Sequence, residues 1–465
     1  MNSRREFLTG VMLAGAACSL SKKASAKKAV KSGNPLIYPM RPMKATTSRV
    51  LTAAIVGAGG RGSVYQSYGR KFPDTMKVVA VADINEKRRN RMGNVWKIPE
   101  DRRYGDYRDL IKAGENGRLA DILIVTLPDS LHYDAAMKGM EQGYDVLLEK
   151  PMAQSVKECL DLLAKQKETG RIVGVCHVLR YAPCFEAMKS AIDRGLIGEI
   201  MSIQHTELVD KIHTAHSYVR GNWRNSKLAT PMIISKCCHD LDLIEWFVGG
   251  RCTHASAEGE QRYFCAKNRP AGATARCTDG CPHEKSCIYS ACNIYVRRRI
   301  WTGPLDLPQK ATDDQVAKIL AASPYSRCVF ACDNDQPEQY AAAFRFENGV
   351  TAAFSYEALS PVGQRRTRII GTKGMLEGGG KGFRFTDLAT GRFWDWDMKI
   401  QEVPGYEQHG HGGGDMRLVR DFLQAVDRRD PSALTSSLEA SVESHLMGFA
   451  CEESRRSGRK VKIHG

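Results

Sequence analysis

This chain of 465 residues has no internal repeat and no low-complexity block. Its one candidate for a membrane segment, the weakly apolar run from Phe7 to Leu20, is too short to span a bilayer as a helix. With 42% hydrophobic and 26% charged residues, the composition is that of an ordinary globular protein. We therefore expect two or three folded domains rather than a disordered or membrane-spanning chain.

Acidic residues are missing from residues 27–50, which carry six basic side chains, and residues 1–26 have four bases against one acid. More than half of the net charge of +16 therefore lies in the first fifty residues, and the rest of the chain has no basic stripe. Nucleic-acid binding requires a concentrated basic surface. The sequence therefore predicts a protein that does not bind nucleic acid.

The basic N-terminus has the parts of an export signal. Residues 3–8, SRREFL, form a twin-arginine pattern, the apolar run follows, and Ala24-Ser25-Ala26 is a small-residue cleavage site. We expect residues 1–26 to be a signal peptide read by the twin-arginine translocation machinery, and residues 27–49 to be a basic tether. The protein would then be periplasmic or bound to the cell envelope, with Cys18 a candidate lipoprotein anchor.

A glycine-rich turn follows the first expected strand, residues 50–56. The segment GAGGRG, residues 57–62, fits the pattern G-x-G-x-x-G and leads into a helix. Gly57 allows a tight turn, Gly59 lets a pyrophosphate approach the backbone, and Gly62 permits close packing of the helix. The helix N-terminus then faces the phosphates. The cofactor contacts expected in this loop are Gly57, Gly59, Arg61 and Gly62.

Three further apolar strands, over residues 77–82, 120–126 and 144–148, alternate with helical segments. This order predicts a doubly wound parallel sheet, with its ligand beyond the carboxyl ends of the strands. Asp83 ends the second strand, where a carboxylate binds ribose hydroxyls and repels a 2′-phosphate, so NAD is favoured over NADP. Arg88 and Arg89 follow closely and would weaken that preference. The other expected cofactor contacts are Thr126, Leu127, Pro128, His132, Glu149 and Lys150.

The glycine loop, the Thr126-Leu127-Pro128 turn with His132, and Glu149-Lys150-Pro151 together resemble the Gfo/Idh/MocA oxidoreductases. The resemblance covers nearly everything from residue 50 onward. It implies an α/β protein in which a Rossmann domain, residues 50–170, precedes a C-terminal α/β domain, residues 171–465. The second domain is expected to carry a large, open-faced, mostly antiparallel sheet. Family analogy also implies a homo-oligomer formed through that sheet.

The resemblance implies Lys150 and His239 as catalytic residues. A lysine beside a cationic nicotinamide has a lowered pKa and can relay a proton, and an imidazole can take the hydroxyl proton as hydride leaves the carbon. Cys237 and Cys238, just before His239, follow the spacing of an apolar helical stripe and are expected in the core. Inositol dehydrogenase-like members carry an aspartate four residues before the histidine, where this chain has Ser235. The proton relay therefore departs from theirs.

Substrate contacts are expected from three places. Arg180-Tyr181 matches the segment that opens the second domain in the family, residues 207–225 form a polar aromatic stretch, and Lys236 lies beside His239. Aromatic faces and hydrogen-bond donors suit a carbohydrate. Later in the chain, Asp415 is expected to cap a helix, and His411 is a further candidate for substrate contact. The expected substrate residues are Arg180, Tyr181, His216, Arg220, Trp223 and Lys236.

Ten of the fifteen cysteines fall between Cys237 and Cys332, and we expect a cysteine-rich insertion over residues 252–332. Closely spaced thiolates can surround Zn²⁺ or close loops as disulfides. Disulfides are permitted by export, a metal by loading before export, and free thiols are the third alternative. The candidate ligands of a structural zinc are Cys277, Cys281, Cys287 and Cys332.

The sequence predicts an NAD(P)-dependent oxidoreductase that removes hydride from a carbinol carbon of a sugar or glycoside. Little free NAD exists outside the cytoplasm, so a cofactor loaded before export is expected to stay tightly bound and to be regenerated in each cycle. Coupled oxidation and reduction of two sugars, as in glucose–fructose oxidoreductases, meets that condition. Transient oxidation with glycosidic elimination, as in NAD-dependent α-N-acetylgalactosaminidases, also meets it. A non-catalytic sugar-binding relative is the third alternative.

Overall fold

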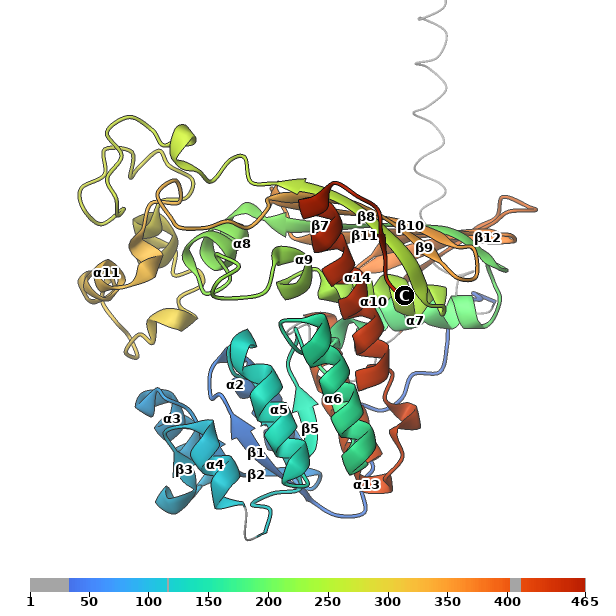
Figure 1. Ribbon diagram of the computed structural model, residues 1–465, viewed down its shortest axis with the longest axis horizontal. Coiled ribbons are helices and arrows are strands. Elements are labelled where there is room, and N and C mark those ends of the chain that lie inside the picture. Colours follow the sequence, from blue (N-terminus) through green and yellow to red (C-terminus); the bar gives the residue numbers. More distant parts are fainter. Residues whose placement is uncertain (1–32, 115–116, 402–410, 465) are drawn as a thin grey trace, which may run out of the picture.

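The computed structural model describes residues 33–114, 117–401 and 411–464, which form two domains (Figure 1). The expected signal peptide, Cys18 and residues 27–32 of the expected tether lie outside these ranges. Among the helices in the described ranges, none combines the length and the apolar character that crossing a membrane requires.

The first domain is built on a six-stranded parallel sheet in the order β3-β2-β1-β4-β5-β6. Side chains of β1 alternate between its faces: Leu51, Ala53 and Ile55 join one apolar core, and Ala54 and Val56 join another. Helices cover both faces, which confirms the predicted doubly wound arrangement. The strands are β1 (Leu51–Val56), β2 (Met76–Ala82), β3 (Arg103–Tyr104), β4 (Ile122–Val125), β5 (Asp145–Leu148) and β6 (Val173–Val175). The helices are α2 (Gly60–Lys71), α3 (Glu86–Trp96), α4 (Tyr107–Ala113), α5 (His132–Glu141) and α6 (Val156–Thr169).

The boundary between the domains differs from the expected one. β6 belongs to the first sheet, so the first domain continues past residue 170. Two helices from the end of the chain also return to it: α13 (Gly414–Arg428) packs on α2, and α14 (Leu438–Ser457) packs on α6. Because α14 also packs on β8 and α10 of the second domain, it ties the two domains together (Figure 1).

The second domain contains a nine-stranded sheet in the order β14-β13-β12-β11-β7-β10-β9-β8-β15, antiparallel except for β10 beside β7. Residues of β9 alternate strictly between exposed and buried, because one face of the sheet packs on helices and the other faces solvent. The expected open-faced, mostly antiparallel sheet is confirmed. Its strands are β7 (Ile200–Asp210), β8 (Cys252–Glu260), β9 (Gln339–Phe346), β10 (Thr351–Ser360), β11 (Gln364–Gly371), β12 (Gly374–Gly379), β13 (Gly382–Asp387), β14 (Phe393–Asp397) and β15 (Val461–Lys462). The helices of this domain are α7 (Pro183–Asp193), α8 (Lys211–Thr214), η4 (Ala215–Arg220), α9 (Met232–Ser235), α10 (Cys238–Val248) and α12 (Met398–Gln401).

The chain between β8 and β9 forms a separate lobe beside α8, which we call the cysteine-rich lobe (Figure 1). Because β8 is a strand of the sheet, this insertion begins after Glu260 and continues to β9, and does not span residues 252–332 as expected. The lobe has an apolar core of its own, in which Phe264, Tyr289 and Phe330 contact one another. Its elements are η5 (Ala266–Asn268), η6 (Cys292–Arg297), η7 (Gly303–Leu305), α11 (Asp313–Ala322) and η8 (Pro324–Ser326).

Residues 33–49, expected to be part of a tether, lie against the folded domains without forming a helix or strand. Leu36 is fully buried in the core of the second domain, and Ala45 is buried in the first. The hydroxyl of Ser48 donates to Asp427 at 2.7 Å. The apolar residues of this segment therefore anchor it to both domains, which a flexible tether would not do.

Candidate active site

The loop after β1 is a turn that requires glycine. Gly57 has a φ of 100°, and a Cβ atom there would lie 2.4 Å from the carbonyl oxygen of Thr126. A Cβ atom on Gly62 would lie 2.2 Å from the carbonyl oxygen of Gly57. The hydroxyl of Thr126 donates to that same carbonyl at 2.6 Å. The turn thus brings α2 and the end of β4 within contact of the loop, as the predicted glycine roles require.

The N-terminus of α2 is open toward the carboxyl end of the sheet. Among the described residues, a Cβ atom on Gly60 would meet nothing within 4 Å, and one on Gly59 would meet only Arg88 Nη1, at 3.8 Å. The helix has no side-chain cap and no acidic residue in its first turn. Its first N–H groups and the positive end of its dipole therefore suit a pyrophosphate. These residues fit the expected dinucleotide.

Asp83 stands beside this loop at the end of β2. Its carboxylate accepts a hydrogen bond from the backbone N–H of Ala58 at 2.7 Å. The two arginines that follow have other partners: Arg88 pairs with Asp306 at 2.6 Å, and Arg89 donates to the carbonyl oxygen of Asp83 at 2.7 Å. Both guanidinium groups are therefore engaged within the protein.

His132 joins two turns at the ends of β4 and β5. Its Nδ1 lies 2.7 Å from the carbonyl oxygen of Pro151, and its Nε2 lies 2.8 Å from that of Leu127. The imidazole is buried, so its polar atoms are used inside the protein. The expected cofactor contact is thus replaced by a supporting role, in which His132 sets the turn containing Leu127 and Pro128 against the turn containing Lys150.

Arg61 and Glu149 form an ion pair beside the glycine loop. Arg61 Nη2 also lies 2.6 Å from Asp415 Oδ1, and the hydroxyl of Tyr65 donates to Glu149 at 2.5 Å. Burial acts to raise the pKa of Glu149, but the charges of Arg61 and Lys150 outweigh it and lower this pKa. Arg61 therefore contacts protein carboxylates, and Glu149 is held as an anion.

Lys150 and His239 meet at the boundary between the domains. The amine of Lys150 donates to the carbonyl oxygen of Ser235 at 2.9 Å, across the boundary and four residues before His239. His239 lies in the first turn of α10, and both of its ring nitrogens are buried without a hydrogen-bond partner in the described residues. Burial, and then the charge of Lys150, hold the pKa of His239 well below its usual value. The imidazole is therefore neutral, and its ring nitrogens are available to hydrogen-bond a ligand.

The two cysteines before His239 lie in the apolar core. Cys237 and Cys238 are fully buried, and burial raises the pKa of both thiols. A protonated, buried thiol is neither a good nucleophile nor a ready metal ligand. In this segment, therefore, the histidine is the residue with available chemistry.

Three other histidines gather around His239, two of which the sequence did not single out. The ring of His239 lies 5.5 Å from that of His411 and 5.9 Å from that of His177, which in turn lies 5.5 Å from His445. Asp415, expected to cap α13, instead accepts from His411 at 3.3 Å, and Gly413 stands at the cap. His177 and His445 belong to no motif, and no local signal identifies them.

A charged network lies beneath the first turn of α10. Arg365 Nε lies 2.7 Å from Asp240 and 3.1 Å from Glu207, and His205 contacts Asp240 at 2.9 Å. Lys236, expected to contact substrate, pairs with Glu207 at 2.9 Å. Its amine is therefore part of this network, next to the site.

Arg180 and Tyr181, both expected to contact substrate, are used in the interior instead. The guanidinium of Arg180 makes two hydrogen bonds of 2.7 Å to Asp242 and one of 2.8 Å to Glu245. The hydroxyl of Tyr181 lies 2.9 Å from that of Ser436. Their partners lie 62 to 255 residues away in sequence, which local reasoning could not supply.

An aromatic wall faces the first domain from the cysteine-rich lobe and the stretch before it. The ring of His216 stacks on Trp301 at 5.2 Å and on Tyr325 at 4.6 Å. Trp223 donates its indole N–H to Asp129, which follows the Thr126-Leu127-Pro128 turn, at 3.2 Å. Of the expected substrate residues, His216 and Trp223 are therefore the two that take part in this wall.

Two family models match the chain. One, described as an oxidoreductase family with an NAD-binding Rossmann fold, matches residues 51–177, and the other, described as its C-terminal alpha/beta domain, matches residues 189–463. Together they cover both domains. The chain belongs to the Gfo/Idh/MocA oxidoreductase family. It is thus an NAD(P)-dependent oxidoreductase.

Individual Gfo/Idh/MocA relatives are distant. YteT of Bacillus subtilis, whose name assigns it to the oxidoreductases, is 24% identical over 345 residues, or 70% of this chain and 78% of YteT. The inositol 2-dehydrogenase/D-chiro-inositol 3-dehydrogenase of Lactiplantibacillus plantarum is 27% identical over 43% of this chain and 53% of that enzyme. An inositol dehydrogenase homologue from Azotobacter vinelandii, solved with NADH and myo-inositol, is 16% identical with a TM-score of 0.65, covering 91% of this chain and 100% of that one. This last similarity shows the shared fold.

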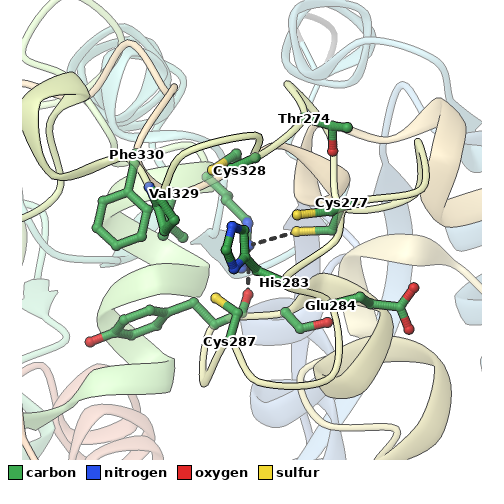
Figure 2. Close-up of a pocket in the computed structure, with 14 residues that line it drawn as sticks. Thr274, Cys277, His283, Glu284, Cys287, Cys328, Val329 and Phe330 are labelled. Atoms are coloured by element: carbon green, nitrogen blue, oxygen red, sulfur yellow. Dashed lines mark hydrogen bonds between the residues drawn. The ribbon is translucent and has the colours of Figure 1, made fainter.

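The cysteine-rich lobe of this Gfo/Idh/MocA protein contains a small cavity, and it changes two predictions (Figure 2). Three of the four candidate zinc ligands, Cys277, Cys281 and Cys287, line the cavity. The fourth cysteine that lines it is Cys328 and not Cys332. Arg220, expected to contact substrate, also lines it and donates to the carbonyl oxygen of Tyr289 at 2.7 Å. Arg220, at the end of η4, therefore packs against the lobe and does not belong to the aromatic wall.

Proposed function

We propose that this Gfo/Idh/MocA oxidoreductase removes a hydride from a hydroxyl-bearing carbon of a sugar or glycoside. One observation carries this proposal: the amine of Lys150 reaches across the domain boundary to the carbonyl oxygen of Ser235, four residues before His239, whose buried ring nitrogens have no partner in the described residues. Two groups able to handle a proton thus meet beyond the carboxyl ends of the strands, where a Rossmann sheet binds its cofactor.

Charge and burial suggest a separate role for Lys150 and for His239. When bound, the nicotinamide accepts the hydride or returns it. Lys150 holds the reacting hydroxyl by a hydrogen bond from its amine. His239, kept neutral by burial and by the charge of Lys150, takes the hydroxyl proton at a ring nitrogen. The rings of His177 and His411 pack beside it and fix its orientation.

The proposed substrate class rests on the aromatic wall. Trp301 is 44% exposed and stacks on His213 and His216, with Tyr325 on the other side of His216. Aromatic faces cover the C–H surfaces of a sugar ring, and neighbouring polar atoms meet its hydroxyls. The name of the Azotobacter homologue supports the same class, because myo-inositol is a polyhydroxylated ring.

We infer that NAD is used in preference to NADP. Asp83 presents its carboxylate beside the glycine loop, and Arg88 and Arg89 are occupied by other oxygens. A 2′-phosphate would meet this negative charge without a free arginine to balance it.

We infer that the cofactor is held tightly, because a loop of the cysteine-rich lobe contacts the edge of the nucleotide site. Asp306, next to η7, accepts hydrogen bonds from two residues at the start of α3. The donors are the guanidinium of Arg88 and the side-chain amide of Asn85, the latter at 3.2 Å. These bonds hold Arg88 near the glycine loop, where its Nη1 would lie 3.8 Å from a Cβ atom on Gly59. Retention suits export by the twin-arginine pathway, which we propose from residues 1–26, because an exported enzyme has little free NAD to exchange with.

The retained cofactor also favours a second candidate, a glycosidase that oxidises its substrate transiently and eliminates the glycosidic bond before the hydride returns. Both candidates use Lys150 and His239 in the same way. They differ in their product: a glycosidase releases a free sugar with no net oxidation.

We further propose a homo-oligomer formed through the open face of the nine-stranded sheet. Exposed residues of β9 and β10 on this face include the small side chains Ala341, Ala343 and Ala353. Small side chains allow the sheets of two copies to approach closely.

The first experiment is to purify the exported protein without added cofactor, denature it and identify the released nucleotide by mass spectrometry. Nearly one NAD(H) per chain is expected. The protein would then be incubated with sugars and aryl glycosides while sugar products and nicotinamide fluorescence are followed. An empty protein that turns over only with added NAD would contradict the retained cofactor. A loaded protein whose nicotinamide is reduced by no sugar or glycoside would contradict the proposed substrate class.

A further inference from the structure

The cysteine-rich lobe contains a cavity that the proposed redox chemistry does not use. Its volume is about 20 Å³, enough for one water-sized atom. Figure 2 shows Cys277, Cys287 and Cys328 around this cavity, together with His283. The four cysteines that line it are Cys277, Cys281, Cys287 and Cys328.

Two segments about fifty residues apart bring these cysteines together. Arg276 and Arg327 pair as an antiparallel bridge. Beside it, the N–H of Cys328 donates to the carbonyl oxygen of Ala275 at 2.9 Å. This pairing places Cys277 and Cys328 on neighbouring strands of backbone, so main-chain hydrogen bonds hold them close without a covalent link.

A buried cation lies against the cavity. Arg220 is 1% exposed, and its Nη2 lies 3.7 Å from the sulfur of Cys277. Its Nη1 is buried with no hydrogen-bond partner in the described part of the chain. The neighbouring Arg224 and Arg327 share Asp333, whereas Arg220 forms no ion pair with any described carboxylate. A buried, unpaired charge is strongly destabilising, so this place calls for an anion.

We propose that Cys277, Cys281, Cys287 and Cys328 bind one zinc ion as thiolates, with Arg220 balancing their charge. Each thiol releases its proton to solvent on binding, and Zn²⁺ with four thiolates carries two negative charges. Two disulfides between the same cysteines would be neutral and would leave Arg220 without a counter-ion. The buried guanidinium therefore decides between alternatives that cysteine spacing leaves open.

Burial raises the pKa of the Cys287 and Cys328 thiols, so a zinc ion has to displace their protons when it binds. As the side chains lie, no three Cys, His, Asp or Glu groups in the described residues are placed to hold a metal ion. The proposed site therefore requires the thiols to turn toward the cavity by rotation about χ1.

Cys332 provides a matched control. It lies in the same loop as Cys328 but does not line the cavity, and its sulfur lies 3.3 Å from the carbonyl oxygen of Cys328. Replacing it with serine should leave the proposed ligands intact.

The test is zinc analysis of the full-length protein, purified anaerobically without chelator. About one zinc per chain is expected in the wild type and in Cys332→Ser, and a several-fold lower content in Cys277→Ser and Cys328→Ser. Arg220→Met should weaken zinc binding about 10- to 100-fold in a chelator competition, as loss of a supporting contact does. Arg224→Met, next to it but paired with Asp333, should bind zinc like the wild type.

Cobalt substitution of the wild type covers the case in which a cysteine variant does not fold. Thiolate-to-cobalt charge-transfer absorption is expected. A protein without metal, whether its cavity cysteines are mapped as disulfides or as free thiols, would overturn the proposal. So would zinc that is lost in Cys332→Ser and kept in Cys277→Ser. None of these results depends on the redox activity, so zinc binding can fail while the proposed function stands.

Discussion

At the scale of single residues, the candidate site depends on imidazole groups kept neutral by burial. The ring nitrogens of His239 have no hydrogen-bond partner in the described residues, and burial, followed by the charge of Lys150, lowers the pKa of this histidine. Asp415, which contacts His411, has its pKa lowered to about 2, because hydrogen bonds from His411 and Arg61 outweigh the opposing effect of burial. The site thus combines a permanently charged carboxylate, Asp415, with a neutral proton acceptor, His239.

Replacement of His239 tests the proton acceptor. In His239→Gln, the rate at which a sugar substrate reduces the bound nicotinamide should fall about 10²- to 10⁴-fold, the usual contribution of a general base. NAD content should stay unchanged, because this side chain is not part of the glycine loop. Single-turnover fluorescence of the nicotinamide measures the rate, and His254→Gln on β8 serves as the control. Wild-type rates in His239→Gln would show that another group takes the proton.

At the scale of elements, the cysteine-rich lobe connects the second domain to the nucleotide edge of the first. Asp306 binds Arg88 at the start of α3, while Trp301 and Tyr325 of the same lobe form the aromatic wall. Both side chains of the Asp306–Arg88 pair are more than two thirds buried, so solvent screens it less than a surface pair. One inserted lobe therefore contributes to both proposed binding regions.

Loosening this contact should release the cofactor. In Asp306→Asn, we expect NADH to dissociate about tenfold faster, which corresponds to about 1.4 kcal/mol for the lost charge-assisted bonds. Stopped-flow fluorescence measures the release. Asp313→Asn, which removes an exposed ion pair with Arg299 inside the same lobe, is the matched control. Equal release rates in both variants and the wild type would mean that the lobe does not retain the cofactor.

At the scale of the whole molecule, the two domains are joined around buried polar groups. α14 packs against both domains, and its His445 accepts a hydrogen bond from the backbone N–H of Met152 at 3.1 Å. Burial lowers the pKa of His445 to about 3, and burial also holds the pKa values of His177 and His239 well below the usual one. The folded protein therefore carries three uncharged histidines at its domain boundary.

These histidines make stability depend on pH. Below about pH 6.5 the unfolded chain binds protons at the three positions and the folded protein does not, so the free energy of unfolding falls as pH falls. At about pH 5.5 each histidine costs about 1.4 kcal/mol, or about 4 kcal/mol together. Urea unfolding at about pH 7.5 and 5.5 measures the loss, and His445→Gln should reduce it by about 1.4 kcal/mol, the share of one histidine. An unchanged pH dependence in that variant would contradict the buried neutral state of His445.

The first domain, the ends of its strands and several of its functional residues can be predicted from the amino-acid sequence alone. Gly57, Asp83 and Lys150 each stand directly after an apolar strand, and parallel strands that alternate with helices bring such ends to one edge. His239 followed from family resemblance together with the spacing of the cysteines around it. These features are local in the sequence or shared with the family, so one sequence is enough to identify them.

Which polar side chains remain available to a ligand depends on contacts that form when the chain folds. Arg180, Arg220 and Lys236 looked equally suited to a substrate, and their partners Asp242, Tyr289 and Glu207 come from distant parts of the chain. The same holds for Cys328 in place of Cys332, which a backbone bridge places at the cavity. A buried charge takes whichever partner the fold brings within hydrogen-bonding distance, and sequence order does not record that distance.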